Sequence, residues 1–332
     1  MASSPVLPWK TKIVFAIFSA VADTVYRSNG TINRRLINFL EAKVSANDKP
    51  YRGVKTSDVV VDETRNLWFR LFTPTEIHKH HVIPLPVIVF FHGGGFSLSS
   101  ADGIAYDELC RKFAVQFSAI IVSVNYRLAP EHRFPSQYDD GIDTLKFLDE
   151  TEFNRFGFPT FADLSKCFLA GDSAGGNLAH HVAVRSGKTN FKRVKVIGQI
   201  SIQPFFGGEE RTESETRLAK AQPIPVERTD WMWKAFLPEG ENRDHEAVNV
   251  SGSRAMDING VKYPATMVVV GGFDPLQDRQ REFYKWLKRN EKEVKLVEYP
   301  NAIHAFLVFP ELPEGSEFIT EARNFVHEVR GK

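Results

Sequence analysis

Short apolar runs alternate with segments of helical pattern along most of the chain. The runs at 86–91 and 119–124 are apolar throughout, as in strands buried on both faces of a parallel sheet. Strands that alternate with helices indicate an α/β fold, with a mostly parallel central sheet and helices on both of its faces. The predicted strands are 58–61, 67–72, 86–91, 119–124, 164–170, 194–202, 265–270 and 294–299. The predicted helices between them are 106–116, 136–150, 178–184, 277–289 and 316–329.

Two segments interrupt this alternation. The N-terminal segment has the pattern of two helices, 9–26 and 32–42. Residues 203–263 are polar, contain Gly207-Gly208 and two prolines, and hold one aromatic helix at 230–236. We therefore expect 203–263 to be an insertion over the edge of the sheet.

Composition excludes some classes of protein. The chain has 332 residues, 42% hydrophobic and 25% charged, which is ordinary for a globular protein and long enough for one large α/β domain. The net charge of +1 gives no reason to expect a nucleic-acid partner, and no apolar run reaches the length of a membrane span. Cys110 and Cys167 have the pattern of buried apolar residues and form no disulfide framework. We therefore expect a cytoplasmic protein, with the nucleus as a further location.

The N-terminal helix has some features of a signal peptide. Lys10 and Lys12 precede the apolar residues 13–22, and residues 20–22 are small enough for a cleavage site. The helical pattern, however, continues past residue 22 to Tyr26. We therefore expect a retained amphipathic helix, with secretion as the alternative.

The segment 168–177 carries the chemical signal around which the chain is organised. Its sequence Gly-Asp-Ser-Ala-Gly at 171–175 matches G-x-S-x-G, in which a serine occupies a sharp turn between a strand and a helix. An apolar run precedes the motif and a helical pattern of small and apolar residues follows it. The two glycines let the strand and the helix approach each other closely. We therefore predict that Ser173 is a nucleophile.

A serine needs a base to remove its proton, and the base is usually a histidine held by a carboxylate. After such a turn the acid follows first along the chain and the histidine second, each just after a strand. Asp274 follows the predicted strand 265–270, and His304 follows 294–299. The competing acids and histidines lie on helices, inside strands or in the insertion. We therefore predict a catalytic triad of Ser173, His304 and Asp274.

A glycine-rich loop can hold the oxyanion of the tetrahedral intermediate. His-Gly-Gly-Gly at 92–95 directly follows the buried strand 86–91, as in lipases and esterases. Successive glycines leave their N–H groups unobstructed, so we assign the oxyanion to the N–H groups of Gly94, Gly95 and Ala174. A phosphate-binding loop is the alternative, but neither of its glycine spacings is present.

Three motifs together resemble the hormone-sensitive-lipase-like branch of the α/β-hydrolases: residues 92–95, Tyr-Arg-Leu-Ala-Pro-Glu at 126–131, and residues 171–177. Within this branch the chain is similar to plant carboxylesterases. The resemblance covers nearly the whole chain. It implies a single α/β-hydrolase domain over 1–332, with an N-terminal helical lid at 1–45 and a cap insertion at 203–263.

The chain is also similar to the gibberellin receptors of this branch, in the stretches 29–34, 211–215 and 235–241. In those receptors the N-terminal segment is a lid over the hormone pocket. This similarity implies that the N-terminus is retained here too.

Three departures from the receptors favour an enzyme. The receptors lack the catalytic histidine, whereas this chain has His304. They carry serine at the position of Gly95. In the insertion helix they have aspartate and tyrosine where this chain has Arg228 and Met232.

We therefore expect a serine carboxylesterase that hydrolyses small-molecule esters through an acyl-enzyme. The alternatives are a gibberellin-receptor-like binding protein, and an eliminase or cyclase of specialised metabolism on the same scaffold. We expect a monomer or a weak homodimer. The substrate contacts are expected at Gly93, Phe96, Tyr106, Trp231 and Met232. Other apolar residues of the cap that either line the pocket or pack in the core are Trp9, Phe15, Phe18, Trp233 and Phe236.

The predicted mechanism needs no cofactor and no metal. His78, His80 and His81 lie in a polar loop that has no cysteine close by in the sequence. A solvated loop therefore explains them better than a metal site.

Overall fold

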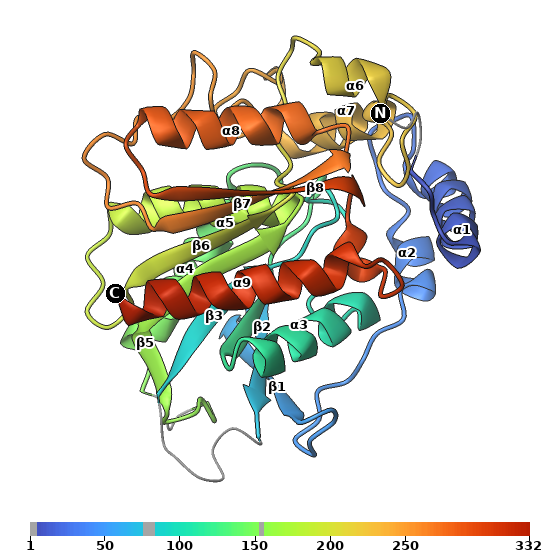
Figure 1. Ribbon diagram of the computed structural model, residues 1–332. Coiled ribbons are helices and arrows are strands. Elements are labelled where there is room, and N and C mark those ends of the chain that lie inside the picture. The colour runs from blue at the N-terminus through green and yellow to red at the C-terminus, as the bar shows by residue number, and fades with distance from the viewer. Residues whose placement is uncertain (1–4, 76–83, 153–155) are drawn as a thin grey trace.

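The apolar runs of the sequence form one central sheet (Figure 1). The computed structural model describes residues 5–75, 84–152 and 156–332, so the predicted histidine loop at 78–81 lies outside the described residues. The strands are β1 (Val54–Asp62), β2 (Leu67–Pro74), β3 (Leu85–Phe91), β4 (Ile120–Asn125), β5 (Ala162–Asp172), β6 (Val196–Ile202), β7 (Ala265–Phe273) and β8 (Val294–Ile303). Their order is β1-β2-β4-β3-β5-β6-β7-β8. The pairs β1–β2 and β2–β4 are antiparallel and the others are parallel, which confirms the predicted α/β-hydrolase fold.

Helices cover both faces of the sheet. They are α1 (Trp9–Val25), α2 (Arg34–Leu40), α3 (Ile104–Gln116), α4 (Ser136–Glu150), α5 (Ala174–Gly187), α6 (Glu213–Arg217), α7 (Val226–Phe236), α8 (Gln277–Arg289) and α9 (Glu314–Gly331). Helices α3 and α9 lie on one face, and α4, α5 and α8 lie on the other (Figure 1). The predicted bounds agree with α4 and α8 at both ends. The insertion differs from the prediction, because the short helix α6 precedes α7 in it. Helix α6 begins with a capping box of Thr212 and Glu215.

The alternation of side chains along β3 explains why this strand has no polar residue. Val89 and Phe91 face the core on the α4–α5 side. Ile88 and Phe90 face the core on the α3–α9 side. Successive side chains of a strand point to opposite faces, so a strand covered on both faces is apolar at every position.

The N-terminal helices α1 and α2 lie beyond the carboxyl ends of the strands, on the same side as α6 and α7 (Figure 1). Arg34, the first residue of α2, donates to the carbonyl oxygens of Ser97 and Ala129, at 2.5 Å each, and pairs with Glu131 at 2.6 Å. The indole of Trp231 on α7 donates to the carbonyl of Arg27 at 2.9 Å. The N-terminal segment is therefore bonded to α7 and to the loops that follow β3 and β4. Among the described residues, no helix is both long enough and apolar enough to cross a membrane.

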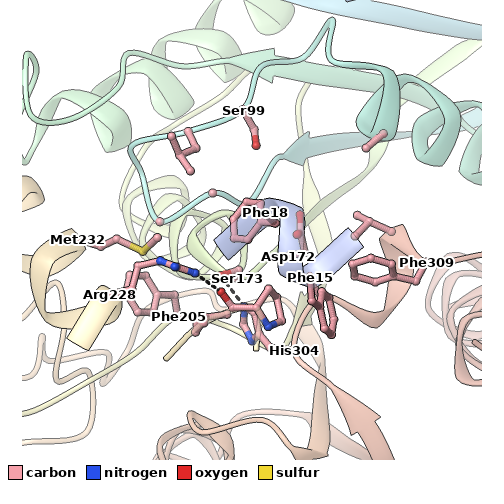
Figure 2. Close-up of a pocket in the computed structure, with 18 of the residues that line it drawn as sticks. Phe15, Phe18, Ser99, Asp172, Ser173, Phe205, Arg228, Met232, His304 and Phe309 are labelled. Carbon is pink, nitrogen blue, oxygen red and sulfur yellow. Dashed lines mark hydrogen bonds between the residues drawn. The ribbon is translucent and has the colours of Figure 1, made fainter. Parts of the chain in front are cut away.

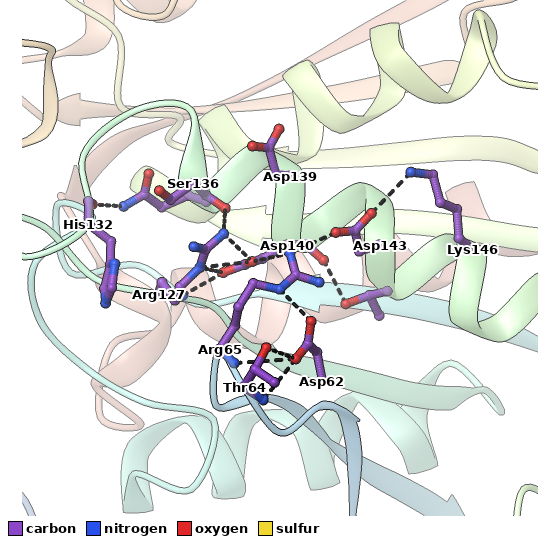
Figure 3. A network of polar contacts seen from close by, with 12 residues as sticks. Asp62, Thr64, Arg65, Arg127, His132, Ser136, Asp139, Asp140, Asp143 and Lys146 are labelled. Atoms are coloured by element: carbon purple, nitrogen blue, oxygen red, sulfur yellow. Dashed lines mark hydrogen bonds and ion pairs between the residues drawn. The ribbon is translucent and has the colours of Figure 1, made fainter.

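A charged network holds the segment 126–131 against α4 (Figure 3). The backbone N–H of Arg127 donates to the fully buried carboxylate of Asp140 at 2.9 Å, and its guanidinium reaches the same carboxylate at 2.8 Å. Arg65 bonds to Asp143 at 2.8 Å on the same helix. The network fixes the loop that follows β4, and that loop supports the glycine-rich segment described next.

Candidate active site

A cavity of about 370 Å³ lies at the carboxyl ends of β3, β5 and β8. Ser173 and His304 form part of its wall, together with Gly94 and Gly95 of the glycine-rich loop. Helix α1 contributes Phe15 and Phe18, and α7 contributes Arg228 and Met232 (Figure 2). The lining is predominantly apolar, as is usual for a site that binds a small organic molecule.

Ser173 occupies the sharp turn that the sequence predicts. It lies directly between β5 and α5, with φ 53° and ψ −117°, a conformation that non-glycine residues rarely adopt. A Cβ on Gly171 would lie 2.3 Å from the backbone of Gly175, and a Cβ on Gly175 would lie 1.9 Å from the carbonyl oxygen of Phe91. The strand and the helix can approach this closely only because both positions are glycine.

The structure brings the three predicted triad residues together. His304 Nε2 lies 2.9 Å from Ser173 Oγ, and His304 Nδ1 lies 2.7 Å from Asp274 Oδ2. Both partners directly follow their strands, since β7 ends at Phe273 and β8 at Ile303.

The carboxylate of Asp274 is itself held in place. Its Oδ2 also accepts a bond of 2.9 Å from Gln280, and its Oδ1 accepts one of 2.9 Å from the N–H of Leu276. Asp274 is fully buried. A fixed, buried carboxylate next to Nδ1 favours the tautomer in which Nδ1 carries the proton and Nε2 is free to accept one.

The glycine-rich loop has a left-handed backbone at two successive positions. Gly94 and Gly95 have φ values of +102° and +59°. No hydrogen bond within residues 5–75, 84–152 and 156–332 uses their N–H groups as donors. Ala174 is the first residue of α5, where a helix N–H has no acceptor within the helix. Ala174 is fully buried and does not line the cavity, although it directly follows Ser173.

A buried hydroxyl connects the glycine-rich loop with the turn at Ser173. The Tyr106 hydroxyl accepts a bond of 2.8 Å from the N–H of Gly93 and donates one of 3.0 Å to Asp172 Oδ2. Burial raises the pKa of Asp172 to about 6, and the bond from Tyr106 opposes that rise. Burial also raises the pKa of Tyr106, so the phenol stays protonated and keeps donating.

His92 is a structural residue in this arrangement. Its Nδ1 donates to the carbonyl of Gly93 at 2.8 Å, and its ring stacks on Tyr126 with centroids 4.2 Å apart. The Tyr126 hydroxyl donates to the carbonyl of His92 at 2.8 Å. Burial lowers the pKa of His92 to about 4, so the ring is neutral near pH 7. These contacts connect the loop to the segment 126–131.

The predicted substrate contacts lie in different places. Tyr106 and Met232 line the cavity, but Gly93, Phe96 and Trp231 do not. Phe96 is fully buried and stacks on Phe236, with centroids 3.9 Å apart.

The other two predicted contacts, Trp231 and Gly93, contact other parts of the protein. Trp231 faces Tyr26 of the N-terminal segment, with centroids 4.6 Å apart. A Cβ on Gly93 would lie 2.5 Å from Asp172, so this glycine packs against the turn at Ser173. Of the apolar cap residues, Phe15 and Phe18 line the cavity, Trp233 and Phe236 pack in the core, and Trp9 is exposed.

Several wall residues carry no motif in the sequence. Phe205 follows β6, and Val308 and Phe309 follow His304. Their positions after the ends of strands are the signal that could have identified them, because loops at the carboxyl ends of parallel strands meet at the site.

Comparison with known proteins gives the family. A family model described as alpha/beta hydrolase fold matches residues 88–308, and one described as carboxylesterase family matches residues 44–131. Gibberellin receptor GID1C of Arabidopsis thaliana is 41% identical, and the match covers 93% of this chain and 91% of the receptor. Carboxylesterase 20 of the same plant is 37% identical, over 86% of this chain and 88% of the relative.

Solved structures agree with these relatives. An esterase of Pyrobaculum calidifontis, in a monoclinic crystal form, superposes with a TM-score of 0.72 at 26% identity, covering 85% of this chain and 87% of the esterase. The chain therefore belongs to the α/β-hydrolase family, and plant carboxylesterases and gibberellin receptors are its relatives within that family.

Proposed function

We propose that the protein is a serine carboxylesterase that hydrolyses small-molecule esters through an acyl-enzyme. The observation that carries the proposal is the position of His304, whose ring nitrogens lie 2.9 Å from Ser173 Oγ and 2.7 Å from Asp274 Oδ2. A serine, a base within reach of it and an acid that orients the base are the requirements of nucleophilic acyl transfer. The family relationship to carboxylesterases supports the same reaction.

In the first half of the proposed reaction, Ser173 attacks the ester carbonyl while His304 Nε2 takes the proton from Oγ. Asp274 stabilises the imidazolium that forms. The oxyanion is bound by the N–H groups of Gly94, Gly95 and Ala174, and each such donor is typically worth about 10²–10³ in rate. His304 then gives its proton to the leaving alcohol, and the acyl group remains on Ser173.

In the second half, a water molecule replaces the alcohol. His304 takes a proton from this water, which attacks the acyl-enzyme. The intermediate collapses, His304 returns the proton to Ser173 Oγ, and the carboxylic acid leaves. The apolar wall formed by Phe15, Phe18 and Phe205 would bind the hydrocarbon parts of the ester.

The test is hydrolysis of 4-nitrophenyl acetate by the wild type and by Ser173→Ala. We expect turnover by the wild type and a loss of at least about 10³-fold in kcat for the variant. Ser186→Ala, which removes a buried hydroxyl near the far end of α5, is the matched control and should keep wild-type activity. Equal turnover by wild type and Ser173→Ala would refute the proposal.

A second candidate function is binding of a small molecule under a lid, as a receptor does. Two observations support it: the 41% identity to a gibberellin receptor, and the contribution of Phe15 and Phe18 of the N-terminal helix to the cavity wall. The receptor-type serine at position 95, however, would require the Met232 side chain to move. A Cβ there would lie 2.2 Å from Met232 Sδ. Calorimetric titration with a gibberellin, together with the ester assay, separates the two functions. Ester hydrolysis without a heat of binding favours the esterase, and a heat of binding without ester hydrolysis favours the receptor.

A third possibility keeps the same residues but changes the reaction. An eliminase or a cyclase would use His304 as the base on a substrate from which water is kept away. Analysis of the products separates this possibility from hydrolysis, because only hydrolysis incorporates oxygen from labelled water into the carboxylic acid.

A further inference from the structure

A second apolar hollow adjoins the candidate active site, between α1, α2 and the start of α3. Its volume is about 390 Å³, similar to the 370 Å³ of the active-site cavity. We call this hollow the distal groove; Val21, Val25, Ile37, Leu40 and Ala42 belong to its wall. Five residues line both spaces: Phe18, Leu98, Ser99, Ala105 and Tyr106. The two spaces therefore share a wall.

We propose that the distal groove binds the end of a long acyl chain whose ester carbonyl lies at Ser173. The proposal rests on the esterase function proposed above. The lining of the groove is mainly aliphatic and aromatic. Two polar side chains of the groove already have hydrogen-bond partners. The carboxylate of Glu41 accepts a hydrogen bond from Ser100 at 3.1 Å, and the hydroxyl of Tyr106 donates one to Asp172. An alkyl chain fits such a surface because it requires no hydrogen bonds.

The groove lies on the side of the site away from His304, so we infer that it holds the acyl part of the ester rather than the alcohol part. His304 must protonate the leaving alcohol, so the alcohol lies next to the imidazole. Ala305, Val308 and Phe309 follow His304 and line the active-site cavity, but none of residues 304–309, all of which the structure describes, lines the groove. Leu98 and Ser99, which follow the proposed oxyanion glycines, line both the cavity and the groove instead.

Figure 2 shows Ser99 and His304 at opposite sides of the view, with Phe18 between them. The acyl chain therefore leads away from His304 and passes Phe18.

Phe18 divides the two spaces. Its ring lies 5.4 Å from the guanidinium carbon of Arg228 on one side. The next turn of α1 places Val21 and Ala22 in the groove. A short acyl group occupies only the active-site cavity, whereas a longer one passes Phe18 and loses contact with water along the groove. Each methylene that becomes buried raises kcat/KM about fourfold. The structure thus assigns to the proposed esterase a preference for medium and long acyl chains.

The test compares 4-nitrophenyl acetate with 4-nitrophenyl octanoate, both below their solubility limits. The readout is the ratio of the two kcat/KM values, octanoate over acetate. For the wild type we expect a ratio of about ten or more. Ala42→Phe and Val21→Phe place a ring in the groove, and each should lower the ratio at least about fivefold. Ala16→Phe adds the same ring on the exposed side of α1 and should keep the wild-type ratio.

The outcomes separate the two proposals. A wild-type ratio near one, or an unchanged ratio in both groove variants, overturns the distal groove as an acyl site. An equal loss of both activities leaves the ratio unchanged and counts as the same result. If the acetate is hydrolysed in a Ser173-dependent way but the octanoate-to-acetate ratio does not behave as expected, only the groove proposal is refuted. If the wild type hydrolyses neither ester, the esterase function is refuted and the groove proposal falls with it.

Discussion

Gly95 and Met232 are in such close contact that a side chain at position 95 should disturb the loop to which we assign the oxyanion. A Cβ built on Gly95 would lie 2.2 Å from Sδ and 2.8 Å from Cγ of Met232. Met232 is only 6% exposed, so its thioether has to move into the cavity or into the core. If the thioether moves into the packed core, the overpacking lowers the folding stability by about 1–3 kcal/mol. The left-handed backbone at φ +59° lowers it by about 1–2 kcal/mol for any residue with a side chain.

The chemical consequence is larger than the loss of stability. If the loop shifts to relieve the contact, one oxyanion donor moves out of position, which costs about 10²–10³ in kcat. We therefore expect Gly95→Ser and Gly95→Ala to lower kcat/KM for 4-nitrophenyl acetate by about 10²-fold each, because the Cβ makes the contact. Met232→Ala in the Gly95→Ser background removes the atoms that clash with the new side chain, and it should raise kcat/KM about tenfold above that of Gly95→Ser.

The assay is a double-mutant cycle in steady-state kinetics, with Met232→Ala alone as the reference. The expected coupling between the two positions is about 1.4 kcal/mol, equivalent to the tenfold recovery. Wild-type activity of Gly95→Ser would refute the reasoning. So would a double variant that is no more active than Gly95→Ser, since the loss would then come from the backbone alone.

Three further variants test the surrounding hydrogen bonds. Asp274→Asn should lower kcat by about 10⁴-fold in the same ester assay with little change of KM, because His304 loses the carboxylate that sets its tautomer; a loss below about tenfold would contradict the assignment. Tyr106→Phe removes the hydroxyl between Gly93 and Asp172 and should lower the free energy of unfolding by about 1–3 kcal/mol in urea titrations; unchanged stability would show that this bond contributes nothing. Burial raises the pKa of Asp172 from 3.8 to about 6, so the stability that its neutral form provides below pH 3.8 is lost as the pH rises through about 6. That loss is about 3 kcal/mol at most. Between pH 4 and 7 the free energy of unfolding of Asp172→Asn should therefore fall by about 3 kcal/mol less than that of the wild type. Parallel curves of unfolding free energy against pH for variant and wild type would exclude Asp172 as the cause.

The chain order and the strand ends were enough to predict which residues the structure brings together. Strand β7 ends directly before Asp274 and β8 directly before His304, so both strands run on beyond their predicted ends at 270 and 299. The carboxyl ends of parallel strands meet at one edge of a sheet. A residue just past such an end is therefore placed near Ser173 without knowledge of side-chain packing. Their catalytic roles remain predictions that the kinetic tests address.

The wall of the cavity could not be predicted in the same way. Trp231 and Met232 are neighbours on α7, and which of them faces the cavity depends on how this helix is rotated against the N-terminal segment. The predicted contact Phe96 has a left-handed backbone at φ 61° and is fully buried in the core. The bond between Tyr106 and Asp172 joins residues that are 66 positions apart, and no local pattern reports it.

The central claim is that Ser173 is an activated nucleophile. The most direct measurement is to incubate the wild-type protein with diethyl 4-nitrophenyl phosphate and to locate the modification by peptide mapping. The account predicts one diethyl phosphate group per chain, attached to Ser173, and none after His304→Ala. An unmodified Ser173 after prolonged incubation, or modification that spreads over several hydroxyl groups, would contradict it.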